Sequence, residues 1–114
     1  MIPRRGEVWL VQFDPAIGDE IQKLRPAVVI GDPAVGLLKV RLVVPFTDWK
    51  ERYSDYPWVT PIDPSLTNGL SKTSAADAFQ CKSVSFERFH RKLGVLSASQ
   101  LQEIVESVGL CIGL

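Results

Sequence analysis

Short apolar segments separated by glycine- and proline-containing turns fill most of this chain, and they constrain its fold more than any other sequence feature. Residues 6–13 alternate apolar side chains between two faces, with Val8 on one face and Trp9 on the other, which is typical of a β-strand. Residues 26–30 form a continuous apolar run, which is typical of a buried strand. We expect strands at residues 6–13, 26–30, 37–45, 58–62, 75–85 and 91–96.

The last segment of the chain carries a helical pattern instead. Ser97 and Gln100 match a capping box, in which each side chain binds a free backbone amide at the start of a helix. Apolar residues then follow at helical spacing, namely Leu101, Ile104, Val105, Val108 and Ile112. Many short strands and one amphipathic helix predict a mainly β fold, a small and strongly bent antiparallel sheet or barrel covered by that helix. Because consecutive strands usually pair, the simplest topology joins them in sequence order.

Length and composition predict one globular domain over residues 1–114, because a chain of 114 residues with 46% hydrophobic side chains suits a single core. No apolar stretch approaches the roughly 18 residues of a membrane span. No apolar signal core follows the basic first residues, so we expect a cytoplasmic protein that does not enter a membrane.

The charge balance and the cysteine content exclude other classes. Thirteen Lys and Arg balance thirteen Asp and Glu, which argues against strong nonspecific binding to a nucleic-acid duplex but permits a local basic strip. Cys81 and Cys111 are too few for a disulfide framework, and one histidine adds too little for a structural zinc site. We therefore expect reduced thiols, no metal and no cofactor.

Arg25 is the first candidate functional residue, because it stands between a polar loop and the apolar run of residues 26–30. Pro26 favours an extended backbone at Arg25. An arginine held there would direct a rigid guanidinium group with five donors at whatever the loop admits, and that geometry suits phosphate. The alternative is an arginine at a strand end that covers apolar surface with its aliphatic part.

Thr47 follows an apolar strand, so its hydroxyl is placed to bind a ligand oxygen. The alternative is a threonine that closes a turn with its own backbone. Further along, Asp77, Gln80 and Lys82 alternate with apolar residues; they are either ligand-binding groups or the outer side of a half-exposed strand. His90 lies in a small basic cluster and is either a general base or a solvated histidine.

An aromatic group interleaved with Lys50 and Arg52 forms a further candidate surface, because the bases of single-stranded nucleic acids stack on such side chains. Its members are Trp49, Tyr53, Tyr56 and Trp58. A dimer contact and the anchor of a loop are equally good interpretations of the same group.

Together and in this order, these features resemble the MazF/PemK family of toxin endoribonucleases from bacterial toxin–antitoxin pairs. The resemblance covers nearly the whole chain, and its most specific part is the opening block with the Arg-Pro run at a fixed distance. The segments that carry it are Arg-Gly-Glu-Val-Trp-Leu-Val at 5–11, Asp-Pro at 14–15, Gly-Asp-Glu at 18–20, Arg-Pro-Ala-Val-Val-Ile at 25–30, Val-Pro-Phe-Thr at 44–47, Gln80, and Leu-Gly-Val-Leu-Ser at 93–97.

The resemblance implies an SH3-like antiparallel barrel, a homodimer, and metal-independent cleavage of single-stranded RNA at short sequences. It implies products with a 2′,3′-cyclic phosphate and a 5′-hydroxyl, and therefore a toxin that inhibits translation and growth. It also implies a cognate antitoxin. We expect this antitoxin to lay an extended acidic segment across residues 18–25 and 49–58, in competition with RNA.

The catalytic arginine and threonine of the family correspond to Arg25 and Thr47. Its RNA-contacting loop corresponds to residues 18–23 and its strand glutamine to Gln80. With the aromatic surface and the nearby lysine, the expected RNA-binding residues are Gly18, Asp19, Glu20, Lys23, Trp49, Gln80 and Lys82. Asp19 departs from family members that have Ser or Thr after the loop glycine, and its negative charge would weaken phosphate binding.

Such a cleavage needs the 2′-oxygen to attack phosphorus, the charge on the phosphorane to be stabilised, and the 5′-oxygen to leave. Arg25 would supply the charge stabilisation, and Thr47 would bind a phosphate oxygen or the 2′-hydroxyl. The general base stays open. Arg25 holds its proton too tightly to be a good acceptor near neutrality, and Glu20 or a water molecule are the other candidates.

Two hypotheses compete with the nuclease, because a fold does not determine a function. In the first, the chain is a toxin that binds a protein target such as DNA gyrase, as a related fold does, through an exposed segment at residues 109–114. In the second, it is a catalytically inactive module that keeps only the dimer and the antitoxin groove. Incubating the purified protein with a long RNA in EDTA separates the three hypotheses.

Overall fold

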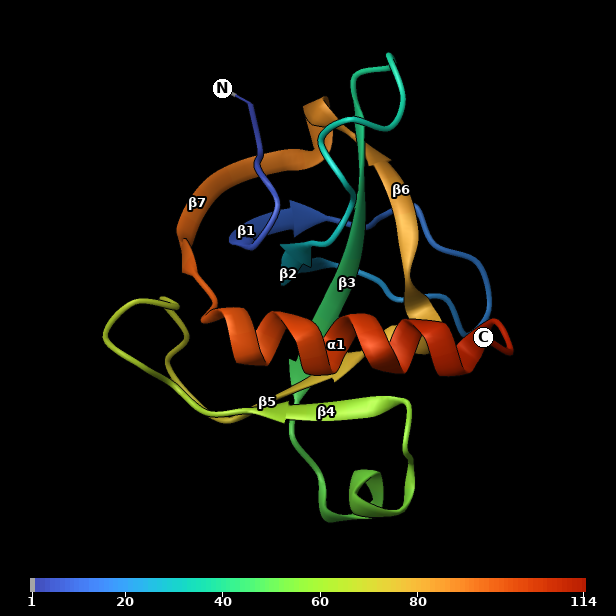
Figure 1. Cartoon of the computed structure of the whole chain (residues 1–114), viewed down its shortest axis with the longest axis vertical. Helices are drawn as coiled ribbons and strands as arrows, with labels where there is room; N and C mark the ends of the chain where they lie inside the picture. The colour runs from blue at the N-terminus through green and yellow to red at the C-terminus, as the bar shows by residue number, and fades with distance from the viewer. Residues whose placement is uncertain (1) are drawn as a thin grey trace.

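The computed structural model describes residues 2–114 and shows seven β-strands followed by one α-helix (Figure 1). The strands are β1 (Glu7–Gln12), β2 (Leu24–Val29), β3 (Val40–Asp48), β4 (Val59–Ile62), β5 (Ser74–Asp77), β6 (Lys82–Ser85) and β7 (Phe89–Val95). The short 3-10 helices η1 (Glu51–Asp55), η2 (Ala78–Gln80) and η3 (Phe86–Arg88) lie between strands, and α1 (Ala98–Cys111) follows β7. The predicted mainly β fold with a C-terminal helix is confirmed.

Strand β3 connects the antiparallel sheet, because it pairs with three other strands. One edge pairs with β2, from Val29 opposite Val43 to Ala27 opposite Pro45. The other edge pairs first with β6 and then, over the last residues of β3, with β5. The strand order is β4-β5-β3-β2-β1-β7, with β6 as a branch on β3.

The predicted sequential strand order is wrong, and of the predicted bent sheet or barrel the structure shows the bent sheet. The first three strands and the β4–β5 hairpin pair in sequence order, but β3 pairs with β5 instead of β4, and β7 returns to pair with β1. The sheet within residues 2–114 is strongly bent but not closed into a barrel, because its two ends, β4 and β7, do not pair with each other. Strand β3 has nine residues and pairs with β2, β5 and β6, which leaves its edges no room for β4.

The predicted strand over residues 75–85 is also wrong, because a 3-10 turn interrupts it. The backbone N–H of Phe79 donates to Oδ1 of Asp77 at 3.1 Å, so Asp77 caps η2 and ends β5. The chain resumes as β6 against a different part of β3. The predicted loop from Thr47 starts slightly later, since β3 continues to Asp48 before η1 begins.

The alternation predicted for β1 divides the core into two clusters. Val8 belongs to a cluster that includes Ile104 of α1, whereas Trp9 packs in a second cluster with residues from β2, β3, β6 and β7. The helix lies across the sheet (Figure 1) and starts with the predicted capping box. Ser97 N–H donates to Oε1 of Gln100 at 3.3 Å, and Gln100 N–H donates to Oγ of Ser97 at 3.2 Å. No helix in the described part of the chain is long and apolar enough to cross a membrane.

Candidate active site

A cavity of about 410 Å³ opens where β2 and β3 separate. Their pairing ends at Ala27 and Pro45, and Pro26 has no N–H with which to continue it. Extending the same register by two residues on each strand places Arg25 opposite Thr47. Residues 24–26 and 46–48 all line the cavity, so the separation of the two strands creates it.

Arg25 is half-buried in the wall of this cavity. Its backbone is paired with Val11 of β1, and its Nε donates to the carbonyl oxygen of Gln22 at 3.1 Å. Within residues 2–114 this is the one hydrogen bond of the side chain, which leaves the terminal guanidinium nitrogens available to a ligand. The geometry agrees with the predicted phosphate-binding role, which stays a prediction.

Thr47 lies inside β3, paired with Ala75 of β5, and lines the same cavity. The alternative that it closes a turn is therefore wrong. Its hydroxyl makes no hydrogen bond to another part of the chain as described from residue 2 to residue 114. The two residues with proposed catalytic roles thus share one cavity, on neighbouring strands.

Two further cations line the cavity, and the sequence analysis missed both as site residues. Arg91 comes from β7, and Lys72 comes from the loop before β5, where its Nζ lies 3.0 Å from Oδ1 of Asp48. With Arg25, the cavity wall contains three cationic side chains and one carboxylate, that of Asp48. The net charge of the whole chain is zero. The cavity is therefore a local basic site, which suits a phosphate ligand.

Alternation along β7 explains why Arg91 is in the wall and its neighbour His90 is not. Side chains two residues apart in a strand share a face, and Arg91 and Leu93 both line the cavity. His90 is exposed and does not line it. A histidine general base in this cavity is thus not supported.

The remaining wall of the cavity is the loop between β4 and β5, and Asn68 holds this loop together. The Asn68 side chain is completely buried. Its Oδ1 accepts from the N–H groups of Ser65 and Leu70 at 3.1 and 3.0 Å, and its Nδ2 donates to the carbonyl of Asp63 at 2.9 Å. A fully satisfied buried amide of this kind fixes a loop in one conformation.

Two glycines allow the same loop to approach β7 closely. A Cβ atom on Gly94 would lie 2.2 Å from the carbonyl oxygen of Thr67, and one on Gly69 would lie 2.1 Å from that of Leu93. Backbone therefore touches backbone at this point, and any side chain would push the cavity wall away from the sheet.

The predicted RNA-binding residues lie outside this cavity. Most belong to the loop between β1 and β2, where the Glu20 carboxylate accepts from the N–H of Ile17 at 2.7 Å and Lys23 has a positive φ of 72°. Lys82 belongs to β6, opposite Val43. The predicted members that do not line the cavity are Gly18, Asp19, Glu20, Lys23, Trp49, Gln80 and Lys82. Their RNA contacts stay predictions.

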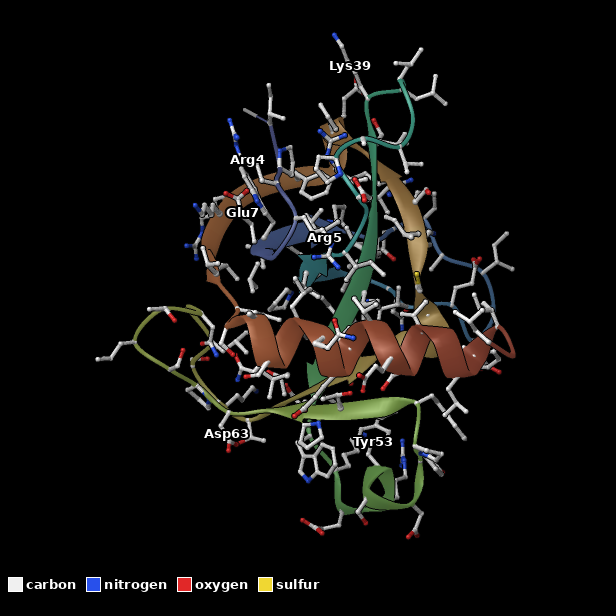
Figure 2. The ribbon with its side chains drawn as sticks, in the orientation of Figure 1. Arg4, Arg5, Glu7, Lys39, Tyr53 and Asp63 are labelled. Atoms are coloured by element: carbon white, nitrogen blue, oxygen red, sulfur yellow. The ribbon has the colours of Figure 1, made fainter. Side chains whose placement is uncertain are left out.

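The predicted aromatic group forms a continuous chain of rings around η1. Neighbouring ring centroids are 5.8 Å apart for Trp49 and Tyr53, 6.0 Å for Tyr53 and Tyr56, and 5.0 Å for the stacked pair Tyr56 and Trp58. Tyr53 lies at the opposite end of the molecule from Lys39 (Figure 2). Because the rings pack on one another, they anchor the loop between β3 and β4; stacking with bases stays a prediction.

The residues with metal-binding chemistry are dispersed. Among residues 2–114, no group of three or more His, Cys, Asp or Glu side chains is placed to hold a metal ion. Cys81 and Cys111 are free thiols, and burial raises the pKa of each. The metal-independent mechanism itself stays a prediction for experiment.

Comparisons with known proteins agree with this architecture. The model of the family of PemK-like, MazF-like toxins of type II toxin–antitoxin systems matches residues 4–112. The chain is 35% identical to endoribonuclease MazF9 of Mycobacterium tuberculosis, over 97% of each protein. It is 25% identical to endoribonuclease MazF of Staphylococcus saprophyticus, over 97% of this chain and 92% of that one.

Solved structures show the same fold. A crystal structure of MazF from Deinococcus radiodurans superposes with a TM-score of 0.82 at 25% identity, covering 100% of this chain and 99% of that one. A MazE–MazF structure from the same organism gives a TM-score of 0.74 at 25% identity, over 100% and 98% of the two chains. The family match includes every strand and all of α1. The chain therefore belongs to the family of PemK-like, MazF-like toxins of type II toxin–antitoxin systems.

Proposed function

We propose that this toxin is a sequence-specific endoribonuclease that cleaves single-stranded messenger RNA without a metal ion and thereby stops translation and growth in the cytoplasm. The observation that carries the proposal is the meeting of Arg25 and Thr47 in one basic cavity. The names of the relatives from M. tuberculosis and S. saprophyticus, both endoribonucleases, support RNA as the substrate.

The proposed reaction is an internal transesterification. The 2′-oxygen gives up its proton and attacks phosphorus while the bond from phosphorus to the 5′-oxygen breaks. The 5′-oxygen takes a proton from water, which gives a 2′,3′-cyclic phosphate and a 5′-hydroxyl. Arg25 stabilises the charge on the phosphorane, and the Thr47 hydroxyl binds a phosphate oxygen or the 2′-hydroxyl. Arg91 and Lys72, which line the same cavity, bind the neighbouring phosphates of the RNA chain.

The proton of the 2′-hydroxyl needs an acceptor, and the geometry favours water over either carboxylate. Glu20 does not line the cavity, and its Oε1 already accepts from Ile17. Asp48 lines the cavity but forms an ion pair with Lys72. A water molecule that takes the proton needs only space beside Arg25, which the cavity offers.

RNA cleavage by the purified protein is expected to persist in excess EDTA, because Arg25 supplies the charge stabilisation that a metal would otherwise provide. Incubation of a long RNA with and without EDTA, followed by analysis of the new ends, measures this. The expected ends are a cyclic phosphate and a 5′-hydroxyl. Activity that disappears in EDTA and returns with magnesium would contradict the mechanism.

The same assay separates the nuclease from both competing hypotheses, and an assay of gyrase activity separates those two from each other. Binding to a protein such as DNA gyrase requires an exposed C-terminal segment, and Ile112 and Leu114 are indeed 72% and 97% exposed. That hypothesis makes no use of the cavity, however, and predicts an RNA that stays intact. An inactive binding module predicts an intact RNA as well, together with antitoxin binding and no effect on gyrase.

We further propose that the toxin is a homodimer and that a cognate antitoxin lays an extended acidic segment over residues 18–25 and 49–58. The cations Arg25, Lys72 and Arg91, which suit RNA phosphates, attract carboxylates equally well. Deinococcus MazF has been solved together with MazE, which supports the existence of such a partner.

The acidic segment alone is expected to compete with RNA and to bind more slowly as salt rises, because rim charges mainly accelerate encounter. A competition assay with the isolated acidic peptide tests this, with its charge-neutral analogue as the control. Non-competitive inhibition, or hydrogen exchange in the two loops that the peptide leaves unchanged, would show that it binds elsewhere.

A further inference from the structure

The loop between β1 and β2, residues 13–23, is long and mostly exposed, with Ile17 81% exposed. Its base is closed by the N–H of Phe13, which donates to the carbonyl of Lys23 at 2.9 Å. Near its first residues, Arg88 donates to the carbonyl of Asp14 at 2.7 Å. Towards its far end, the side chain of Ile21 is buried in the second core cluster. These contacts hold the loop at Asp14 and Ile21 and, in the part of the chain that the structure describes, leave the residues between them without a hydrogen bond to a strand.

Gln80, the last residue of η2, provides a further support for this loop. Its Oε1 accepts from the N–H of Ile21 at 3.0 Å, and its Nε2 donates to the carbonyl of Asp19 at 2.8 Å. The two bonds tie residues that are 59 and 61 positions apart in the chain. They also determine the orientation of the amide, because a flipped group would set donor against donor and acceptor against acceptor.

Gln80 is itself held firmly. It ends η2, whose first turn is capped by Asp77 and whose last turn is closed by the N–H of Cys81, which donates to the carbonyl of Ala78 at 3.2 Å. This short helix packs against α1. The Gln80 amide therefore connects an exposed loop to an element that packs against α1.

We propose that Gln80 is a positioning residue, which holds residues 19–21 in the conformation that presents the loop to RNA and does not itself read a base. This inference rests on the proposed function. Both polar ends of the Gln80 side chain are already used, so reading a base would require it to release Asp19 or Ile21. A loop ordered in advance binds RNA without the entropic cost of ordering it on contact.

Gln80→Met tests the inference, because methionine keeps the length of the side chain and removes both hydrogen bonds. Gln102→Met is the matched control, since Gln102 is an exposed helix residue whose amide donates to Glu106. In the free protein, the amide hydrogen of Ile21 is expected to exchange on the order of 10- to 100-fold faster in Gln80→Met and at an unchanged rate in the control. An Ile21 amide with unchanged exchange would overturn the proposal.

A second variant covers the case in which Gln80→Met does not fold. Gln80→Glu keeps the acceptor for Ile21 and loses the donor to Asp19, so its exchange rate at Ile21 is expected to lie between those of the wild type and of a variant without either bond. Protection equal to the wild type at Ile21 in this variant would also overturn the proposal.

Cleavage measurements distinguish positioning from base recognition. A disordered loop is expected to raise KM roughly 10-fold and to leave kcat within about 2-fold, by the same factor for every cleaved sequence. A preference changed at one nucleotide position would show that Gln80 reads a base. Hydrogen exchange requires no RNA, so a wild-type protein that cleaves no RNA would refute the proposed function without deciding the role of Gln80.

Discussion

Replacing Arg25 with alanine is expected to lower the rate of RNA cleavage by about 100-fold or more, because the variant loses the group that stabilises charge on the phosphorane. The fold should be little affected. The side chain is half-buried at a cavity wall and donates one hydrogen bond, to Gln22, which corresponds to a stability change on the order of 1 kcal/mol. Single-turnover cleavage and thermal unfolding of the same samples measure the two effects.

Thr47→Val and Arg4→Ala complete this experiment. Valine keeps the shape of threonine without the hydroxyl, so cleavage should slow while the strand pairing with Ala75 persists. Arg4 is an exposed arginine that does not line the cavity, so its removal should leave cleavage unchanged. A large drop in melting temperature for Arg25→Ala would show that Arg25 is mainly structural, and an unchanged rate for Thr47→Val would remove Thr47 from the mechanism.

Gly94→Ala is expected to destabilise the protein by roughly 3 kcal/mol or more, which lowers Tm by about 10 °C or more. The added Cβ would lie 2.2 Å from the carbonyl oxygen of Thr67 and 2.6 Å from the carbonyl carbon of Asn68. Both are backbone atoms, so the whole cavity wall has to move away from β7. Calorimetry of the purified variant measures the change.

Gly109→Ala is the matched control for that substitution. A Cβ on Gly109 would meet Leu114 at 3.7 Å, an ordinary contact, and alanine favours a helix over glycine by about 1 kcal/mol. The control should therefore be neutral or slightly stabilised. A Gly94→Ala protein as stable as this control would mean that the loop and β7 do not touch through their backbones.

The parts of the fold that depend on neighbouring residues were predictable from the sequence. The capping box at Ser97 and Gln100 and the alternation of Val8 and Trp9 are properties of a few consecutive positions, and both are confirmed. The turn at Asp77 is local too, but a carboxylate that caps a 3-10 turn looks the same in sequence as one on a strand face. The predicted strand over residues 75–85 failed for this reason.

Pairings between strands that are not consecutive depend on the whole chain, and they were not predictable. Nothing within the segment of β7 indicates that it pairs with β1 and not with its predecessor, and nothing within β5 indicates that it takes the edge of β3. These pairings depend on which strand edges and apolar faces remain uncovered once the neighbouring strands are in place.

Some residues of the candidate site were likewise predictable from the sequence, and others were not. Arg25 and Thr47 were found by their motifs, and the structure brings them to one cavity. Lys72 lies in a loop without a regular pattern, and only the pairing of β7 with β1 brings Arg91 to the cavity. One signal for Arg91 was available, because it shares a strand face with Leu93. Asn68 offered none, since its partners become visible only in the folded loop.

The pairing of the first strand with the seventh has a consequence for the timing of toxicity during protein synthesis. The cavity wall includes Leu10 from β1 and Leu93 from β7, which are neighbouring strands in the sheet but lie near opposite ends of the chain. A ribosome makes the first of these residues long before the last, and contacts so distant in sequence form late in folding. A nascent chain in which β7 has not yet been synthesised lacks Arg91 and Leu93, which form one side of the cavity. The cavity is therefore complete only after synthesis has passed residue 93, and we expect the nascent chain to gain its activity late.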